Sequence, residues 1–256
     1  MKDWKNVKEN LIKFLQDELE KTGVQNVVFG LSGGLDSAVV AVLCKEAFKK
    51  ESITAVLMPS SFSSQSSVDD SIKLCEKFDI NYEIVSIEPM LNAYIKSMQN
   101  DFLRIGNFSA RLRMSVLFDI SSVKKALVVG TSNKSEILLG YSTIFGDSAY
   151  AFNPIGDIYK SDLFEFAKYL GVNVEIIEKK PSADFYSGQS DEDDLGYTYS
   201  KIDSYLKAKY DEEKTFEELK NLNFEDDFMT KIDSRVKINE FKRKMPKIAS
   251  LGEFNG

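Results

Sequence analysis

The sequence predicts an α/β fold: a doubly wound, mainly parallel five-stranded sheet with helices on both faces, followed by a helical C-terminal segment at about 196–256. Three observations predict it. Short apolar runs alternate with stretches whose apolar residues recur at helical spacing, which is typical of a parallel sheet covered by helices. The 256 residues suit a single domain with a sizeable core. Beyond about residue 160, the sequence contains only helical patterns and loops.

Four of the strands can be placed along the chain. They are expected at 24–31, 53–58, 82–87 and 126–130. The periodicity of apolar residues predicts helices at 4–22, 36–50, 66–78, 89–100 and 107–124. In parallel sheets of this kind, ligands bind beyond the carboxyl ends of the strands. The segments that follow the first and fourth strands are therefore the first places to look for a site.

The composition excludes several classes of chemistry. The chain has no histidine, which excludes Ser-His-Asp and Cys-His nucleophiles and histidine-bound zinc. A net charge of −7 argues against a nucleic-acid partner. No apolar run is long enough to span a membrane, and the N-terminus does not resemble a signal peptide. Cys44 and Cys75 have no Cys-x-x-Cys spacing and are expected to be buried, reduced thiols, so we expect a cytoplasmic protein without a membrane partner.

A glycine-rich loop connects the first strand directly to a helix. Its sequence is Gly30-Leu31-Ser32-Gly33-Gly34-Leu35-Asp36-Ser37. Glycines allow a tight turn, and the amides at a helix start favour a bound anion. The loop lacks the Lys of a Walker motif and carries Asp36 instead. Because a carboxylate repels phosphate unless a cation lies between them, the loop predicts a magnesium–pyrophosphate site. A plain strand-to-helix turn with Asp36 or Ser37 as helix cap is the alternative.

The pattern Ser-Gly-Gly-x-Asp-Ser resembles the pyrophosphate loop of the ATP pyrophosphatases. These enzymes cleave ATP between the α and β phosphates and leave AMP on an acceptor. The rest of the chain, from about residue 24 to 205, is similar to the ammonia-dependent NAD synthetases of that superfamily. The similarity is carried by Asn107 to Met114, Gly130 to Glu136, Gly140 to Thr143, Gly146-Asp147, Pro154-Ile155, Lys160, Lys180 to Asp184 and Gln189 to Gly196, and more weakly by Phe241-Lys242-Arg243.

The resemblance implies a fold like that of the adenine nucleotide alpha hydrolases and a homodimer with the active site near the subunit interface. It also implies roles for individual residues. ATP would contact the loop from Gly30 to Ser37 together with Thr131, Lys160 and Ser182. Magnesium would be held by Asp36 and Glu136, and deamido-NAD by Arg111 and Lys242. The catalytic candidates are Asp36, Lys160 and Asp147, the last as a ligand of ammonium.

Each of these residues also has an ordinary structural interpretation. Thr131 suits a helix cap, Glu136 a solvated helical acid and Lys160 a surface lysine. The acid run at 191–194 suits a solvated loop, whereas the family's equivalent of loop 183–195 closes over the site.

The chain also departs from the family at three positions. Many NAD synthetases have a lysine where Ile144 stands, an aspartate where Ala151 stands and a histidine where Phe241 stands. The first two of those residues are associated with deamido-NAD, so the contacts with this substrate are less well predicted than those with ATP.

The resemblance implies a ligase that amidates deamido-NAD to NAD. The nicotinate carboxylate would take AMP from ATP with release of pyrophosphate, and ammonia would then displace the AMP. Ammonia is expected as the direct donor because 256 residues leave no room for a glutaminase, although a separate glutaminase partner stays open. Two alternatives also stay open at this point: a tRNA-modifying ATP pyrophosphatase and a non-catalytic nucleotide-binding module.

Overall fold

A parallel sheet forms the centre of the computed structural model, which describes residues 2–95, 101–182 and 189–250. The described sheet has four strands in the order β3-β2-β1-β4. They are β1 (Asn26–Gly30), β2 (Ile53–Leu57), β3 (Tyr82–Ile84) and β4 (Ala126–Val128). All three strand pairs are parallel. Because the strand order reverses between β1 and β4, their carboxyl ends form the switch point where such sheets bind ligands.

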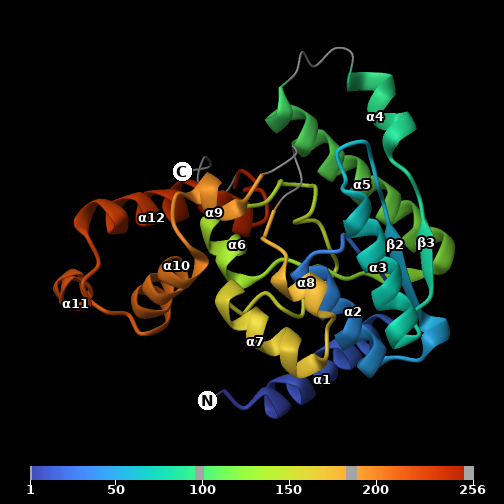
Figure 1. The fold of residues 1–256 in the computed structure, drawn as a ribbon, viewed down its shortest axis with the longest axis horizontal. Helices are drawn as coiled ribbons and strands as arrows, with labels where there is room; N and C mark the ends of the chain where they lie inside the picture. Colours follow the sequence, from blue (N-terminus) through green and yellow to red (C-terminus); the bar gives the residue numbers. More distant parts are fainter. Residues whose placement is uncertain (1, 96–100, 183–188, 251–256) are drawn as a thin grey trace.

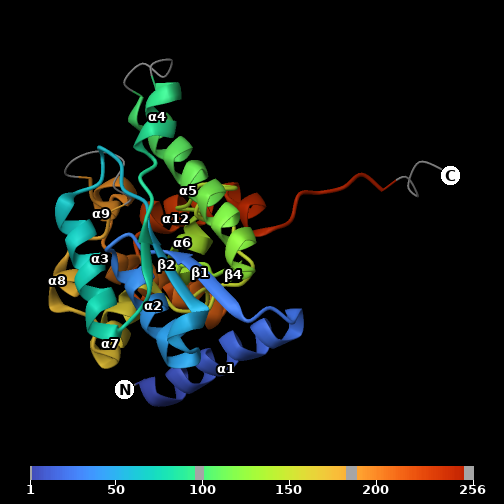
Figure 2. The same cartoon turned by 90° about the vertical axis from the view of Figure 1, so that its right-hand side faces the viewer.

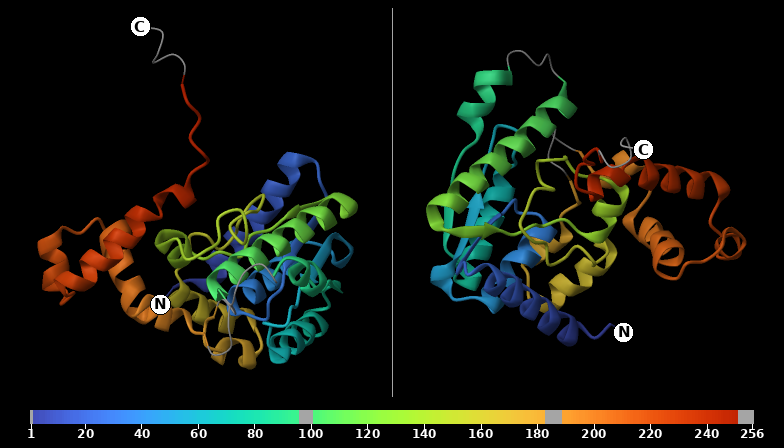
Figure 3. Two further views of the ribbon diagram at one scale, coloured as in Figure 1. Left: turned by 90° about the horizontal axis from the view of Figure 1, so that it is seen from above. Right: turned by 180° about the vertical axis from the view of Figure 1, so that it is seen from behind.

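Helices cover both faces of the sheet, as predicted (Figure 1). Successive residues of β1 point to opposite faces: Val27 and Phe29 belong to one apolar cluster, and Val28 belongs to another. The first face is covered by α1 (Trp4–Thr22), α2 (Leu35–Ala47), α3 (Gln65–Phe78), α7 (Lys160–Leu170) and α8 (Val174–Glu178). The second is covered by α5 (Phe102–Lys124), which lies across the sheet in the view from behind (Figure 3). The short η1 (Lys50–Ser52) precedes β2, and α4 (Glu88–Ile95) packs against α5.

The prediction of a fifth strand is wrong for the described part of the chain. The chain around Phe152 lies beside the end of β4 but forms only an isolated parallel bridge, between Val129 and Phe152. Two hydrogen bonds flank it: Gly130 N donates to Phe152 O, and Ala151 N donates to Val128 O, both at 2.8 Å. The pairing stops there because Pro154 follows after one residue and has no amide to continue a ladder.

The element boundaries differ from those predicted in physically understandable ways. Helix α5 begins at Phe102 and not at 107, because the Asp101 side chain accepts a hydrogen bond from Arg104 N at 3.0 Å and caps the helix there. The predicted strand 82–87 ends at Ile84. The predicted helix 89–100 is α4 up to Ile95, and 96–100 lie outside the described residues. Cys44 and Cys75 are buried free thiols, as predicted.

The last part of the chain is helical and packs around the short helix α6 (Lys134–Leu139) (Figures 1 and 2). Its elements are α9 (Asp191–Leu195), α10 (Tyr199–Leu206), the π-helix η2 (Lys207–Asp211), α11 (Phe216–Asn221), α12 (Asp226–Ile238) and the 3-10 helix η3 (Glu240–Arg243). A separate apolar cluster joins them, with Tyr199, Tyr205 and Phe228 fully buried. Of the predicted segment 196–256, residues 251–256 lie outside the described residues. Within the described ranges, no helix has the length and apolar character that crossing a membrane requires.

Candidate active site

The glycine loop forms a tight turn at the carboxyl end of β1. Gly33 has a φ of +75°, and a Cβ there would lie 2.2 Å from the carbonyl oxygen of Ser67 on α3. The loop is braced internally, since Ser37 Oγ donates to Gly34 O at 3.1 Å and accepts from Ser32 N at 3.3 Å. Gly34 is the N-cap of α2 and has no side chain with which to cap the first amides. Those amides are left for an anion, which the helix dipole also favours.

A lysine and two carboxylates meet beside this loop. Lys160, the first residue of α7, forms an ion pair with Asp36 Oδ2 and a second one with Glu136 Oε1 at 3.3 Å. Asn133 Nδ2 donates to Asp36 Oδ1 at 2.8 Å, and the Asn133 amide and side chain form a capping box with Glu136. The three charged residues come from α2, α6 and α7. The structure therefore brings together three residues that are 24 to 124 positions apart.

Burial makes this cluster electrostatically demanding. The exposed fractions of the side chains are 4% for Lys160, 15% for Asp36 and 17% for Glu136. Burial, and next to it the charge of Asp36, raises the pKa of Glu136 to about 8. Burial opposes the charge of Lys160, but Asp36 and Glu136 outweigh it and raise the pKa of the ammonium. The site therefore holds more carboxylates than one lysine neutralises, and an additional cation would stabilise it.

One large pocket, of about 890 Å³, contains most of the residues predicted from the sequence. Its lining includes these predicted residues: Gly30, Leu31, Ser32, Gly34, Leu35, Asp36, Ser37, Thr131, Glu136, Asp147, Lys160, Ser182 and Lys242. The pocket opens at the carboxyl ends of β1 and β4, where Gly30 and Val128 both line it. This is the switch point of the sheet, so topology and side-chain chemistry indicate the same place.

Two predicted residues do not line this pocket. Gly33 packs against Ser67 of α3 and does not face the pocket that the rest of the loop lines. Arg111 is exposed, and its Nε donates to the carbonyl oxygen of Ile144 at 3.3 Å. Its neighbour Arg113 lines the pocket instead, with Nε donating to Met58 O at 3.1 Å. The assignment of Arg111 to deamido-NAD stays a prediction.

The far side of the pocket is built by the turn that follows α6. Asp147 Oδ1 accepts from Thr143 N at 2.7 Å and closes that turn. Lys242, from η3, donates to the carbonyls of Gly140 and Ser142 at 2.7 and 2.8 Å. Arg243 beside it donates to Leu138 O at 2.7 Å. The basic residues of η3 therefore cap the carboxyl end of the helix that carries Glu136, where cations are favoured.

Several residues of the site had no role in the sequence-based interpretation. Asn133 holds Asp36, as described above. Lys179 lines the pocket and donates to Ser67 Oγ, next to the place where Gly33 meets α3. Tyr199 is buried, with Lys160 Nζ 5.7 Å from its ring centre. Only their positions in the fold identify them, because neither a lone asparagine nor a lone lysine forms a motif.

The acid run at 191–194 divides between the site and its rim. Asp191 is 4% exposed, lines the pocket and has one oxygen without a hydrogen-bond partner among the described residues. Its other oxygen accepts from Tyr199 Oη at 3.3 Å. Asp194 accepts from Tyr141 Oη at 2.8 Å. The interpretation of the whole run as a solvated loop is therefore wrong for Asp191. Residues 183–188 of the predicted closing loop lie outside the described residues.

Comparisons with known proteins agree with this geometry. A family model described as NAD synthase matches residues 7–246. The chain is 46% identical over 251 residues to the NH(3)-dependent NAD(+) synthetase of Campylobacter jejuni subsp. doylei, a match that covers 97% of this chain and 100% of the relative. Two solved structures are similar over 97% of the chain. One is an NMN synthetase from Francisella tularensis (TM-score 0.86, 32% identity, 99% of that chain), and the other is an NH3-dependent NAD synthetase from Campylobacter jejuni (TM-score 0.82, 40% identity, 100% of that chain). The resemblance predicted from the motifs is thus confirmed: the chain belongs to the NAD synthase family.

Proposed function

We propose that this chain is an ATP-dependent ligase that amidates deamido-NAD to NAD with ammonia, by way of an adenylate. The observation that carries the proposal is the Asp36–Lys160–Glu136 cluster beside an uncapped helix start, in a pocket of about 890 Å³. The high identity to ammonia-dependent NAD synthetases over nearly the whole chain supports the same reaction. A tRNA-modifying enzyme and a non-catalytic binding module are not favoured.

In the first step, an oxygen of the nicotinate carboxylate attacks the α-phosphorus of ATP. A new P–O bond forms, the bond to the β-phosphate breaks, and pyrophosphate leaves. The chain contributes the amides at the start of α2, the hydroxyl of Ser32 and the ammonium of Lys160, while the Ser37 hydroxyl braces the loop through Gly34 O. We expect the departing pyrophosphate to lie beside these groups, where they would stabilise the negative charge that accumulates on it in the transition state.

In the second step, ammonium first releases one proton to solvent, and the nitrogen of the resulting ammonia attacks the acyl carbon. AMP leaves with the electrons of the C–O bond, and the nitrogen releases a second proton to solvent as the amide forms. Asp147 faces the pocket near the turn 143–147, and we propose that it binds the incoming ammonium. We propose that Arg111 and Lys242 contribute to the binding of deamido-NAD. Binding of deamido-NAD to Arg111→Ala and Lys242→Ala, measured by calorimetry, tests this; unchanged affinity in both variants would remove the assignment.

The residues present fit a magnesium ion. Two largely buried carboxylates, Asp36 and Glu136, share one lysine, and the pKa of Glu136 is raised to about 8 by burial and by Asp36. Oxygen donors of this kind are the ligands that magnesium prefers, with the remaining positions filled by phosphate oxygens and water. When bound, the ion would offset the charge of the phosphates and of the leaving pyrophosphate.

A second candidate substrate is the mononucleotide. The similar structure from Francisella tularensis is described as an NMN synthetase, whose product would arise by the same amidation of nicotinate mononucleotide. The family's usual residues at Ile144 and Ala151 are also absent from this chain. Parallel assays with the two acids decide between them, because the enzyme should release pyrophosphate from ATP only in the presence of the acid that it accepts.

We also propose that the chain works as one domain in a cytoplasmic homodimer. The site draws residues from the sheet region and from α9, α10 and η3, so neither part would form it alone. Four large apolar side chains of α5 are 41–75% exposed: Phe102, Leu103, Phe118 and Val123. A second copy covering them would explain their exposure. Sedimentation at micromolar concentration tests this, and a monomer would refute the dimer.

The decisive experiment supplies ATP, magnesium, ammonium and either acid to the purified chain and measures pyrophosphate, AMP and the amide. We expect NAD only when ATP, magnesium, ammonium and deamido-NAD are all present, with AMP and pyrophosphate formed in amounts equal to that of NAD. Asp36→Ala should abolish pyrophosphate release and leave the circular dichroism spectrum unchanged. Normal turnover in this variant would refute the role of the loop carboxylate. Turnover with only the mononucleotide would replace the substrate and keep the mechanism.

A further inference from the structure

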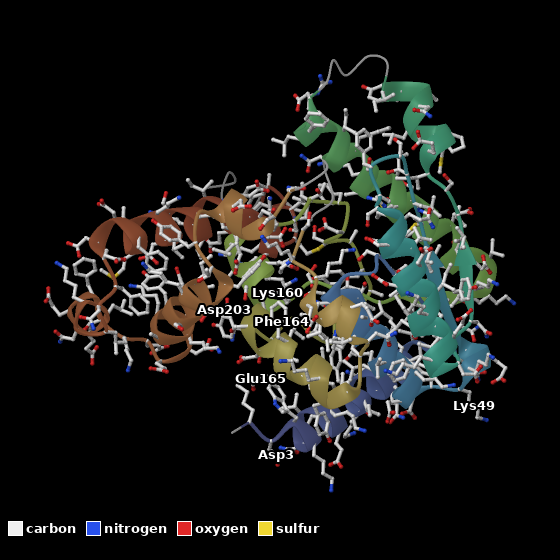
Figure 4. The ribbon with its side chains drawn as sticks, viewed as in Figure 1. Asp3, Lys49, Lys160, Phe164, Glu165 and Asp203 are labelled. Carbon is white, nitrogen blue, oxygen red and sulfur yellow. The ribbon has the colours of Figure 1, made fainter. Side chains whose placement is uncertain are left out.

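Asp203 is a fully buried carboxylate that neither lines the pocket nor belongs to the cluster described above. It lies on α10, close to the start of α7, where Figure 4 labels it together with Lys160. Its two oxygens are used in different directions. Oδ1 accepts from Ser135 Oγ on α6 at 2.6 Å, and Oδ2 accepts from Ser161 N on α7 at 2.7 Å. A buried charge is costly unless it is hydrogen-bonded in this way, so its position is strongly specified.

The hydroxyl of Ser135 extends this connection to Lys160. It donates to Asp203 and accepts from Lys160 N at 2.9 Å. The N-cap residue of α7, Tyr159, does not cap the first amides of the helix with its side chain. Ser135 on α6 and Asp203 on α10 therefore cap α7 from other helices, because they accept the hydrogen bonds of its first two amides. A carboxylate is also favoured at this end of the helix dipole.

These hydrogen bonds lie next to the charged residues of the site. Ser135 immediately precedes Glu136, and Ser161 immediately follows Lys160. The link therefore fixes the start of α7 relative to α6 next to the two residues whose ion pair, at 3.3 Å, faces the phosphate loop. A shift of one helix along the other would move the ammonium away from Asp36 and Glu136 together.

We infer that Asp203, acting through Ser135, is a positioning residue that sets the ammonium of Lys160 against Asp36 and Glu136 for adenylate formation. This inference rests on the proposed function. Asp203 touches no substrate in this role. Its effect is on the rate of the step in which pyrophosphate leaves, not on the affinity for ATP.

The test uses the full chain, four single variants and the double variant Asp203→Asn/Ser135→Ala. Asp203→Asn keeps the size but loses charge and one acceptor, and Ser135→Ala removes the relay. Ser135→Thr keeps the hydroxyl. The matched control is Asp233→Asn. Asp233 lies on α12, and within the described ranges its carboxylate accepts hydrogen bonds from Tyr205 Oη at 2.7 Å and Tyr210 Oη at 3.3 Å, neither of which belongs to α6 or α7. The measurements are single-turnover pyrophosphate release, the KM for ATP, the unfolding free energy, and amide hydrogen exchange at 160–161 without substrate.

We expect Asp203→Asn and Ser135→Ala each to slow pyrophosphate release about 10- to 100-fold, with a KM for ATP changed less than about threefold, since small misplacements cost rate before affinity. The double variant should be no slower than the slower single one, because both changes break one link. Ser135→Thr and Asp233→Asn should stay within about threefold of the wild type. Amide exchange at 160–161 should rise in Asp203→Asn.

Three results would overturn the inference: a folded Asp203→Asn protein with the wild-type rate, single effects that multiply in the double variant, or unchanged amide exchange. If Asp203→Asn does not fold, the comparison of Ser135→Ala with Ser135→Thr decides, and equal rates for the two refute the link. Failure of the proposed function looks different, since the wild type would then release no pyrophosphate with either acid. In that case, unchanged amide exchange at 160–161 in Asp203→Asn would still refute the link. Raised exchange would show that Asp203 holds the start of α7, without a role in adenylate formation.

Discussion

Replacing Glu136 by glutamine should remove a loss of stability that the wild-type protein undergoes as the pH rises. Burial and Asp36 raise the pKa of Glu136 from 4.5 to about 8. Between these values the native state keeps a proton that the unfolded state has released, so the unfolding free energy falls as the pH increases. At about 1.4 kcal/mol per pH unit, the loss has an upper limit of about 5 kcal/mol. Glutamine cannot ionise, and it still suits the capping box with Asn133.

The assay is urea unfolding between about pH 5 and about pH 8.5 without magnesium. Wild type should lose about 2–5 kcal/mol more than Glu136→Gln over this range. The matched control is Glu218→Gln, since Glu218 occupies the same capping-box position on α11 but is exposed and has a lowered pKa because of its hydrogen bonds with Thr215. Parallel pH dependences for wild type and Glu136→Gln would refute the electrostatic argument. Added magnesium should flatten only the wild-type curve, because a nearby cation favours the ionised carboxylate.

Three further predictions follow from single contacts. Lys160→Met should slow pyrophosphate release about 10²- to 10³-fold and destabilise the fold by about 3–5 kcal/mol, because Asp36 and Glu136 are left buried together without the lysine. Single-turnover assays and urea unfolding measure the two effects, and wild-type values in both would contradict the prediction. Asp147→Asn should raise the KM for ammonia while the rate of pyrophosphate release stays unchanged, and an unchanged KM would exclude Asp147 as the ammonium ligand. Gly33→Ala should destabilise the protein by about 1–3 kcal/mol in thermal unfolding, because φ is +75° and the added Cβ would lie 2.2 Å from Ser67 O. The control is Gly171→Ala, where φ is +76° but no atom lies within 4 Å of the added Cβ, so it measures the backbone strain without the clash.

Features specified by nearby residues in the sequence were predictable. The glycine loop is one of them, because glycines between an apolar run and a helix, followed by an acid, already describe a phosphate site that needs a cation. The sheet's four strands and its covering helices follow from apolar periodicity in the same way. Predictions failed where a single side chain sets a boundary. Asp101 starts α5 five residues early, and Pro154 stops what would have been a fifth strand.

Residues that act from a distance were predictable only by resemblance. Nothing in the local sequence distinguishes Lys160 from a surface lysine, yet it is 4% exposed between two acids. The family resemblance identified it and Glu136, but it gave no indication of Asn133, whose amide holds Asp36 at 2.8 Å. Such a contact depends on how α6 approaches α2, and that approach is set by packing across the whole switch point of the sheet.

Asp203 shows that some of this information was present in the sequence in another form. Tyr199, Ile202 and Leu206 recur at helical spacing and form the buried stripe of α10, and Asp203 falls within that stripe. An acid at such a position must either be exposed by a break in the helix or be buried with partners, because an unpaired charge in the core is too costly. The continuous helical pattern favours burial, and a buried carboxylate needs donors, which at this edge of the fold are Ser135 and the first amides of α7. A charged residue in an apolar stripe therefore indicates where one helix holds another, even when no motif marks it.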